Sequence, residues 1–118
     1  MNTVILPWPP RELNPNTGTN WRKKIKFIKD YRLQCRLLTQ QAKMVVPDGE
    51  GSLHLWLTFC PPNRKRRDDD NLIARFKAGR DGIADALGID DSRFITHPQI
   101  DTQTGGYIRV VITGEMDD

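Results

Sequence analysis

The sequence predicts an α+β protein in which helices pack on a small mixed, partly antiparallel sheet. Residues 52–60 alternate apolar and polar side chains, which is typical of a strand with one buried face. From Trp21 onwards, apolar side chains recur every three or four residues, which indicates an amphipathic helix. Along the chain, such segments follow the order β-α-β-α-β-β without an internal repeat.

Prolines and turn-forming residues separate the first elements. We expect a short strand at residues 3–6 that ends at Pro7, followed by an exposed loop at residues 11–20. The helix that begins at Trp21 is expected to continue until Pro47. Its apolar side should carry Ile25, Ile28, Tyr31, Cys35, Leu38, Ala42 and Val45.

A second helix is expected to begin at Asp70 and Asn71 and to stop at Gly88, because glycine suits a helix C-terminus. Gly79 and Gly82 are the positions at which this helix could break. Its apolar side should carry Leu72, Phe76, Ile83, Ala84 and Leu87.

Two further strands are expected at residues 94–100 and 107–113. The turn-forming residues 104–106 lie between them, so the pattern predicts that the two strands form a hairpin. His97 in the first of these strands and His54 in residues 52–60 are candidate ligands or bases, although a partly exposed strand histidine is the commoner role.

The length of 118 residues predicts one domain, residues 1–118, around a single core. With 37% hydrophobic and 28% charged residues, the chain has the composition of a globular protein rather than a disordered one. No apolar run approaches the roughly 20 residues that span a bilayer, and the first residues lack a secretory signal. Cys35 and Cys60 are too few for a disulfide scaffold or a four-cysteine zinc site. We therefore expect a cytoplasmic protein without a membrane partner.

Charge is distributed unevenly along the chain. Residues 1–67 carry a net charge of +9 and residues 68–118 a net charge of −6. The sign changes where the basic residues 64–67 meet the acidic residues 68–70. A basic surface binds polyanions, whereas an acidic cluster repels them unless a cation intervenes. The combination predicts a protein that binds phosphates and acts on them.

Two groups of aspartates are candidate metal ligands. Asp68 and Asp70 are two residues apart, so at the extended end of a strand both project from the same face. Asp91 could join them only if the chain reverses or the second helix breaks. Hard divalent ions such as Mg²⁺ prefer carboxylate oxygens and keep water molecules for substrate phosphate. The alternative role for Asp70 is a helix cap, which does not explain three consecutive aspartates.

Two basic segments are candidate phosphate contacts. They are the run before the aspartates and the outer face of the first helix, which include Arg64, Lys65, Arg66, Arg67, Lys23 and Lys24. Either segment alone would be an ordinary solvated surface, and only the neighbouring aspartates favour contact with DNA.

The string Arg66-Arg67-Asp68-Asp69-Asp70-Asn71-Leu72, followed by Asp85-Ala86-Leu87 and Asp90-Asp91, resembles the signature of the RusA-type Holliday junction resolvases. The opening Leu6-Pro7-Trp8-Pro9-Pro10 is also similar to the N-terminus of that family, so the resemblance covers nearly the whole chain. It implies a RusA-like fold and a homodimeric, Mg²⁺-dependent endonuclease, with Mn²⁺ as an alternative ion. Such an enzyme nicks four-way DNA junctions symmetrically in DNA recombination and repair.

The resemblance also implies roles for individual residues. Asp68, Asp70 and Asp91 would be the catalytic, metal-binding aspartates. Asn71 would help to place the DNA.

One position departs from the family pattern. The family usually carries a lysine three residues after the asparagine, and here that position is Ala74. Lys77 would then supply the positive charge to catalysis, or Arg75, which is also a candidate DNA contact, would do so. Without that lysine, a catalytically inactive DNA-binding protein is one alternative function. A general metal-dependent nuclease for flaps or single strands is the other.

Overall fold

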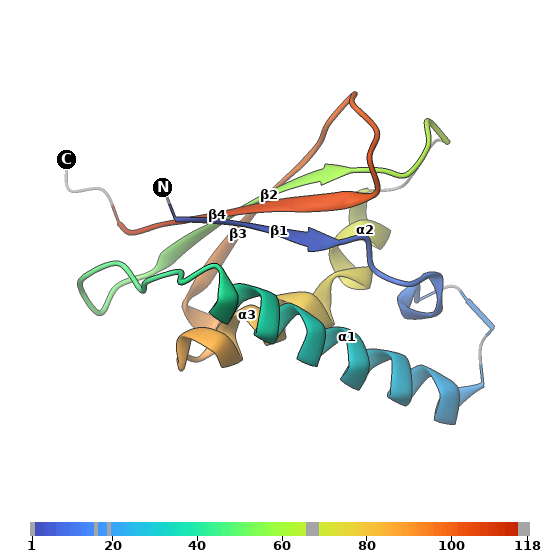
Figure 1. Cartoon of the computed structure of the whole chain (residues 1–118), viewed down its shortest axis with the longest axis horizontal. Helices are drawn as coiled ribbons and strands as arrows, with labels where there is room; N and C mark the ends of the chain where they lie inside the picture. Colours follow the sequence, from blue (N-terminus) through green and yellow to red (C-terminus); the bar gives the residue numbers. More distant parts are fainter. Residues whose placement is uncertain (1, 16, 19, 66–68, 116–118) are drawn as a thin grey trace.

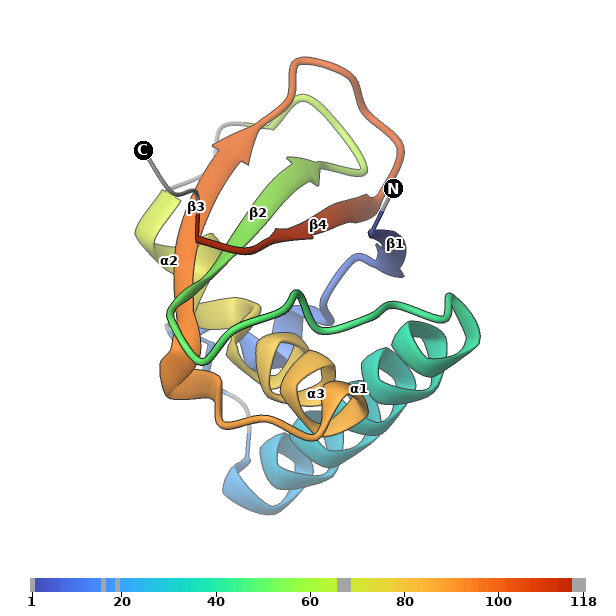
Figure 2. The ribbon, with the colours of Figure 1, turned by 90° about the vertical axis from the view of Figure 1, so that its left-hand side faces the viewer.

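A computed structural model describes residues 2–15, 17–18, 20–65 and 69–115, and there a four-stranded sheet carries helices on one face (Figure 1). In both views, α1 and α3 lie side by side beneath the sheet (Figure 2). The elements of the described ranges are β1 (Thr3–Pro7), η1 (Arg11–Leu13), α1 (Trp21–Gln41), β2 (Leu53–Cys60), α2 (Asp69–Arg75), α3 (Lys77–Leu87), η2 (Asp91–Arg93), β3 (Phe94–Ile100) and β4 (Tyr107–Thr113). None of these helices has both the length and the apolar composition of a membrane span.

The sheet is mixed, as the sequence predicts. Its strand order is β1-β4-β2-β3, in which β4 runs antiparallel to both of its neighbours. β3 runs parallel to β2, with Phe94 opposite Leu53. The predicted α+β class and the partly antiparallel sheet are therefore confirmed.

One face of the sheet forms the core. Leu53, Leu55, Leu57 and Phe59 are buried on β2, whereas His54, Trp56 and Thr58 lie on its other face, so the predicted alternation is confirmed. The helices cover the buried face with side chains that include Tyr31, Cys35, Leu72, Phe76 and Ile83. The opposite face of the sheet has no helix packed on it among the described residues.

The predicted hairpin between the last two strands is wrong, because β2 lies between β3 and β4. The connection after β3 crosses the end of β2 and is held there by backbone hydrogen bonds. Gly105 donates to the carbonyl of Pro61 at 2.8 Å, and Gly106 donates to that of Cys60 at 2.9 Å. The turn residues are thus real, with Gly106 at a φ of 76° that favours glycine, but they join strands that are not neighbours.

The first helix ends at Gln41, six residues before Pro47, so the predicted C-terminal end is wrong. The side chain of Asn2 pairs with the backbone of Val45, accepting from its N–H at 3.0 Å and donating to its carbonyl at 2.6 Å. This contact draws residues 43–46 towards the start of β1 and away from the helix axis. Val45 is consequently 69% exposed instead of lying on the apolar stripe.

The predicted second helix is two helices, and the break falls at Phe76 rather than at a glycine. Phe76 has φ −88° and ψ 0°, and its buried ring meets those of Tyr31 and Phe59 edge to face. Packing against both the sheet and α1 therefore fixes the ring where the helix changes direction. Gly88 ends α3 with a φ of 67°, which confirms the predicted stop.

Gly82 lies at the contact between α1 and α3. A Cβ added there would lie against the carbonyl oxygen of Arg32 and 3.0 Å from the Cβ of Cys35. The glycine thus allows the backbones of the two helices to approach closely, and it does so inside a regular helix.

We expect Gly82→Ala to destabilise the fold by about 1–3 kcal/mol, because the clash with α1 outweighs the higher helix propensity of alanine. Gly18→Ala is the matched control, since an added Cβ there meets no described atom within 4 Å. Urea denaturation followed by circular dichroism measures both variants. A Gly82→Ala variant as stable as the parent would show that the helices do not depend on this approach.

Candidate functional site

The acidic motif lies at the start of α2. Arg64 and Lys65 are exposed in the loop that follows β2. Arg66, Arg67 and Asp68 lie outside the described residues.

The structure begins α2 at Asp69 and describes the backbone of Asp70 as the second residue of that helix. Asn71 follows in the first turn and is half-buried, with contacts of its own. The helix that the sequence predicts to begin at Asp70 and Asn71 therefore begins one residue earlier, and Asp70 is helical rather than at the extended end of a strand.

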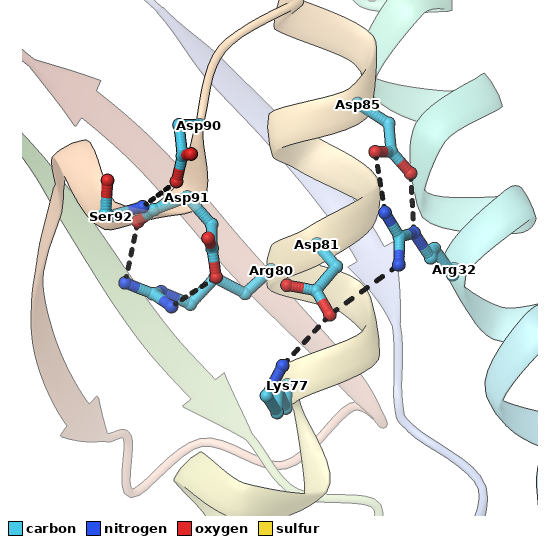
Figure 3. A network of polar contacts seen from close by, with 8 residues as sticks. All are labelled: Arg32, Lys77, Arg80, Asp81, Asp85, Asp90, Asp91 and Ser92. Carbon is cyan, nitrogen blue, oxygen red and sulfur yellow. Dashed lines mark hydrogen bonds and ion pairs between the residues drawn. The ribbon is translucent and has the colours of Figure 1, made fainter.

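Asp91 lies in η2, on a segment that returns along α3. After Gly88 the chain reverses, so that η2 lies beside the first half of α3 rather than beyond its end (Figure 3). The reversal is one of the two conditions under which Asp91 could approach the acidic motif. Its neighbour Asp90 accepts a 2.9 Å hydrogen bond from the backbone N–H of Ser92, which lowers the pKa of that carboxyl below its usual range.

Arg80 holds Asp91 in place. Its Nη1 lies 3.2 Å from Oδ2 of Asp91, and its Nη2 donates to the carbonyls of Asp91 at 3.0 Å and Phe94 at 3.3 Å (Figure 3). The guanidinium also lies over the Phe94 ring, with Cζ 5.7 Å from the centroid. One arginine thus fixes both the carboxylate and the backbone of η2. The role of Arg80 was not predictable from the sequence, because its partners lie 11 and 14 residues away, beyond the reversal of the chain.

The chemistry of Asp91 fits a hard divalent cation, because it offers carboxylate oxygens on a half-exposed side chain. In the described part of the chain, no group of three or more histidine, cysteine, aspartate or glutamate side chains could hold a metal. Asp68 and the side chain of Asp70 fall outside that description. Of the three aspartates in the predicted metal site, Asp91 is therefore the one whose side chain the structure describes.

A pocket of about 310 Å³ lies between α1, the segment around η1, and the junction of α2 with α3. It brings together residues that are far apart in the sequence, including three of the predicted cations. Its lining is Leu13, Pro15, Lys24, Ile28, Ala74, Arg75, Lys77, Ala78 and Asp81. Ala74 stands one helical turn after Asp70, so the pocket begins beside the acidic motif.

Lys77 belongs to a chain of alternating charges along α3 and α1. Its Nζ lies 3.2 Å from Oδ2 of Asp81, and the same oxygen lies 3.9 Å from the guanidinium of Arg32 (Figure 3). Arg32 binds Asp85 through two hydrogen bonds of 2.6 and 2.8 Å. This guanidinium lowers the pKa of the Asp85 carboxyl. This network was not predictable from the sequence, because Arg32 comes from another helix.

Arg75 is bound to the N-terminal segment. Its Nε and Nη2 donate to the carbonyl of Pro9 at 3.0 and 2.6 Å, and Nε also donates to that of Pro10 at 3.1 Å. Its Cζ lies 5.8 Å from the centroid of the Trp8 ring. These contacts give Arg75 a structural role in addition to its predicted role as a DNA contact.

Lys23 and Lys24 are adjacent in the sequence but line different pockets. Lys23 faces a second pocket of about 590 Å³. That pocket is lined by Arg11, Glu12, Asn20, Lys23, Lys26, Phe27 and Asp30. Only Lys24 is placed beside the acidic motif.

The two histidines meet on the open face of the sheet. Nδ1 of His54 and Nε2 of His97 are 2.7 Å apart, and the Trp56 ring stacks on His97 with centroids 4.1 Å apart. The parallel pairing of β2 with β3 brings these rings together. They lie on the face of the sheet that points away from the helices and from the pocket.

The sequence was also compared with those of other proteins. No family model matches it. It is similar to a protein of Xylella fastidiosa (strain Temecula1) that is described as an uncharacterized protein. The two are 44% identical over 119 residues, which cover 97% of this chain and 77% of the Xylella protein. The chain belongs to the family of that protein.

We expect Arg75→Met to lower the free energy of unfolding by about 2 kcal/mol, because three hydrogen bonds from a charged donor to carbonyls are lost. Amide exchange at Leu13, which donates to Pro10, should accelerate as the segment loosens. Arg22→Met, at an exposed position of α1, is the control. If Arg75→Met matches the parent in both measurements, these bonds do not hold the segment.

Proposed function

We propose that this protein is a Mg²⁺-dependent, structure-selective endodeoxyribonuclease of the RusA type, which resolves four-way DNA junctions in recombination and repair. One observation supports it most. The acidic motif opens a helix whose next turn, at Ala74, lines a pocket together with Lys24 and Lys77, so two ammonium groups lie at a pocket that begins one helical turn after Asp70. A phosphodiester that is to be hydrolysed needs both kinds of group.

In this proposal Asp68, Asp70 and Asp91 hold the metal. When bound, Mg²⁺, or Mn²⁺ in its place, activates a water molecule and neutralises charge on the leaving oxygen. Arg80 keeps Asp91 oriented towards the motif. The reversal of the chain at Gly88 supports the participation of Asp91, because it returns this residue along α3.

The basic residues bind the sugar-phosphate backbone. Arg64 and Lys65 are exposed beside the acidic motif, and Arg66 and Arg67 continue the same run. Such contacts give affinity that falls steeply with salt but carry little sequence information. Selectivity would then depend on the shape of the junction, and Asn71 would position the strand next to the metal.

Two active centres are needed to cut two opposed strands. A chain with one acidic motif supplies one centre, so we propose a homodimer whose two-fold axis matches that of the junction. Because its substrate is chromosomal DNA, we place the enzyme in the cytoplasm.

A DNA-binding protein without catalytic activity is the second candidate. Two observations favour it: Ala74 lacks an ammonium group, and Asp91 is paired with Arg80 at 3.2 Å. A general nuclease for flaps or single strands would use the same residues on another substrate.

Cleavage of a labelled four-way junction, with and without Mg²⁺, tests this proposal. We expect paired symmetric nicks with Mg²⁺, and little cutting of a linear duplex of the same sequence. Asp70→Asn should abolish cutting but retain junction binding, because it removes a metal ligand and a repulsive charge. Asp48→Asn, in an exposed loop, is the control that should cut normally.

Two other outcomes would favour a different function, and a third would contradict the metal assignment. Binding without cutting by the parent protein would favour the inactive DNA-binding protein. Single nicks on flaps or single strands would favour the general nuclease. Parental cleavage by Asp70→Asn would contradict the metal assignment.

A further inference from the structure

The pocket beside α2 contains three cationic side chains, and two of them are bound by other described residues. Arg75 donates to the carbonyls of Pro9 and Pro10, and Lys77 is paired with Asp81 at 3.2 Å. The side chain of Lys24 makes no hydrogen bond or ion pair with any described residue. Lys24 is therefore the cation of the pocket that can take an external anion.

Burial separates Lys24 from the other lysines of the same helix turn. Lys24 is half-buried, whereas Lys23 and Lys26 are exposed. An ammonium group that loses part of its water without gaining a counter-charge favours the binding of an anion. The adjacent walls of the pocket are apolar at Ile28 and Ala78, which suits a sugar next to a phosphate.

The position of the pocket indicates which anion Lys24 would bind. Ala74 lines it and stands one turn after Asp70 on α2, so a phosphate bound to Lys24 would lie beside the acidic motif. The small side chain of Ala74 leaves the space between the two helices open. The ammonium group of Lys24 lies on the α1 side of the pocket and Ala74 on the α2 side. A phosphate in the pocket could therefore contact Lys24 and also lie close to the start of α2.

We infer that Lys24, on α1, is the residue that binds the backbone phosphate at the cleavage site, in preference to Lys77 and Arg75. This inference rests on the proposed nuclease function and names a group that contacts its substrate. Lys24 would stabilise the negative charge that develops on the phosphate as it is attacked. Lys77 would remain the partner of Asp81 and contribute to the position of α3.

The first experiment compares Lys24→Met, Lys77→Met and Lys43→Met. Methionine keeps the length of the side chain and removes its charge, and Lys43 is the control because it is exposed beyond the end of α1 and belongs to neither basic segment. In single-turnover cleavage of a four-way junction at saturating protein, Lys24→Met should be slower by about 100-fold or more. Lys77→Met should slow cleavage much less than Lys24→Met does, Lys43→Met should stay within a few fold of the parent, and Lys24→Arg should recover part of the rate.

The second experiment does not depend on cleavage. The phosphorylated dinucleotide pTpT is titrated without metal, and the amide signals of residues 74–78 report its binding by nuclear magnetic resonance. Lys24→Met should weaken this binding by about tenfold or more, because a charge-assisted hydrogen bond is lost. Lys43→Met should bind as the parent does.

The two experiments separate failure of this inference from failure of the proposed function. If the parent cleaves junctions and Lys24→Met cleaves at the parental rate, the inference is wrong and the nuclease function stands. If the parent does not cleave but pTpT binding depends on Lys24, the phosphate site stands and the nuclease function is wrong. A pTpT affinity that Lys24→Met leaves unchanged would overturn the inference in either case.

Discussion

The arrangement of the molecule depends on the close approach of α1 and α3, which is possible because Gly82 has no side chain at their contact. Two further interactions fix the position of α1. Tyr31 is buried and donates from its hydroxyl to the carbonyl of Pro7 at 2.6 Å, which ties α1 to the end of β1. Arg32 binds Asp85 through both oxygens, which ties α1 to α3. As a result, α1 faces the junction of α2 and α3 across a narrow space, and the pocket that carries Lys24 lies in that space.

The change of direction at Phe76 is the second requirement for the site. A single continuous helix would carry the acidic motif and the residues after it along one axis. Instead, α2 and α3 are separate, and the ring of Phe76 packs between the sheet and α1. The reversal at Gly88 and the contacts of Arg80 then return Asp91 along α3. Local packing at one aromatic residue and one arginine therefore determines where the start of α2 and Asp91 lie relative to α3.

The sequence predicted the parts of this structure that depend on local patterns. The alternation in β2 and the stop at Gly88 are examples, because periodicity and backbone conformation decide them. Contacts between distant segments were not predictable in this way. The turn at Gly106 indicates a change of direction but does not specify that β4 pairs with β2, and the contact of Asn2 with Val45 shortens α1 from outside the helix. The candidate site likewise depends on contacts between distant segments that local patterns do not specify. Lys23 and Lys24 are equivalent in the sequence, and only the tertiary structure places one of them beside the acidic motif.

We propose that Asp91 and the acidic motif at the start of α2 form one ion site. A titration of the protein with Mg²⁺, followed by amide signals in nuclear magnetic resonance, tests this proposal without DNA and without a cleavage assay. We expect the signals of Asp70 and Asn71 and that of Ser92 to shift with the same midpoint, while that of Asp48 in its exposed loop does not move. If the signals at the start of α2 shift and that of Ser92 does not, or if none of them shifts, Asp91 does not share an ion with the motif.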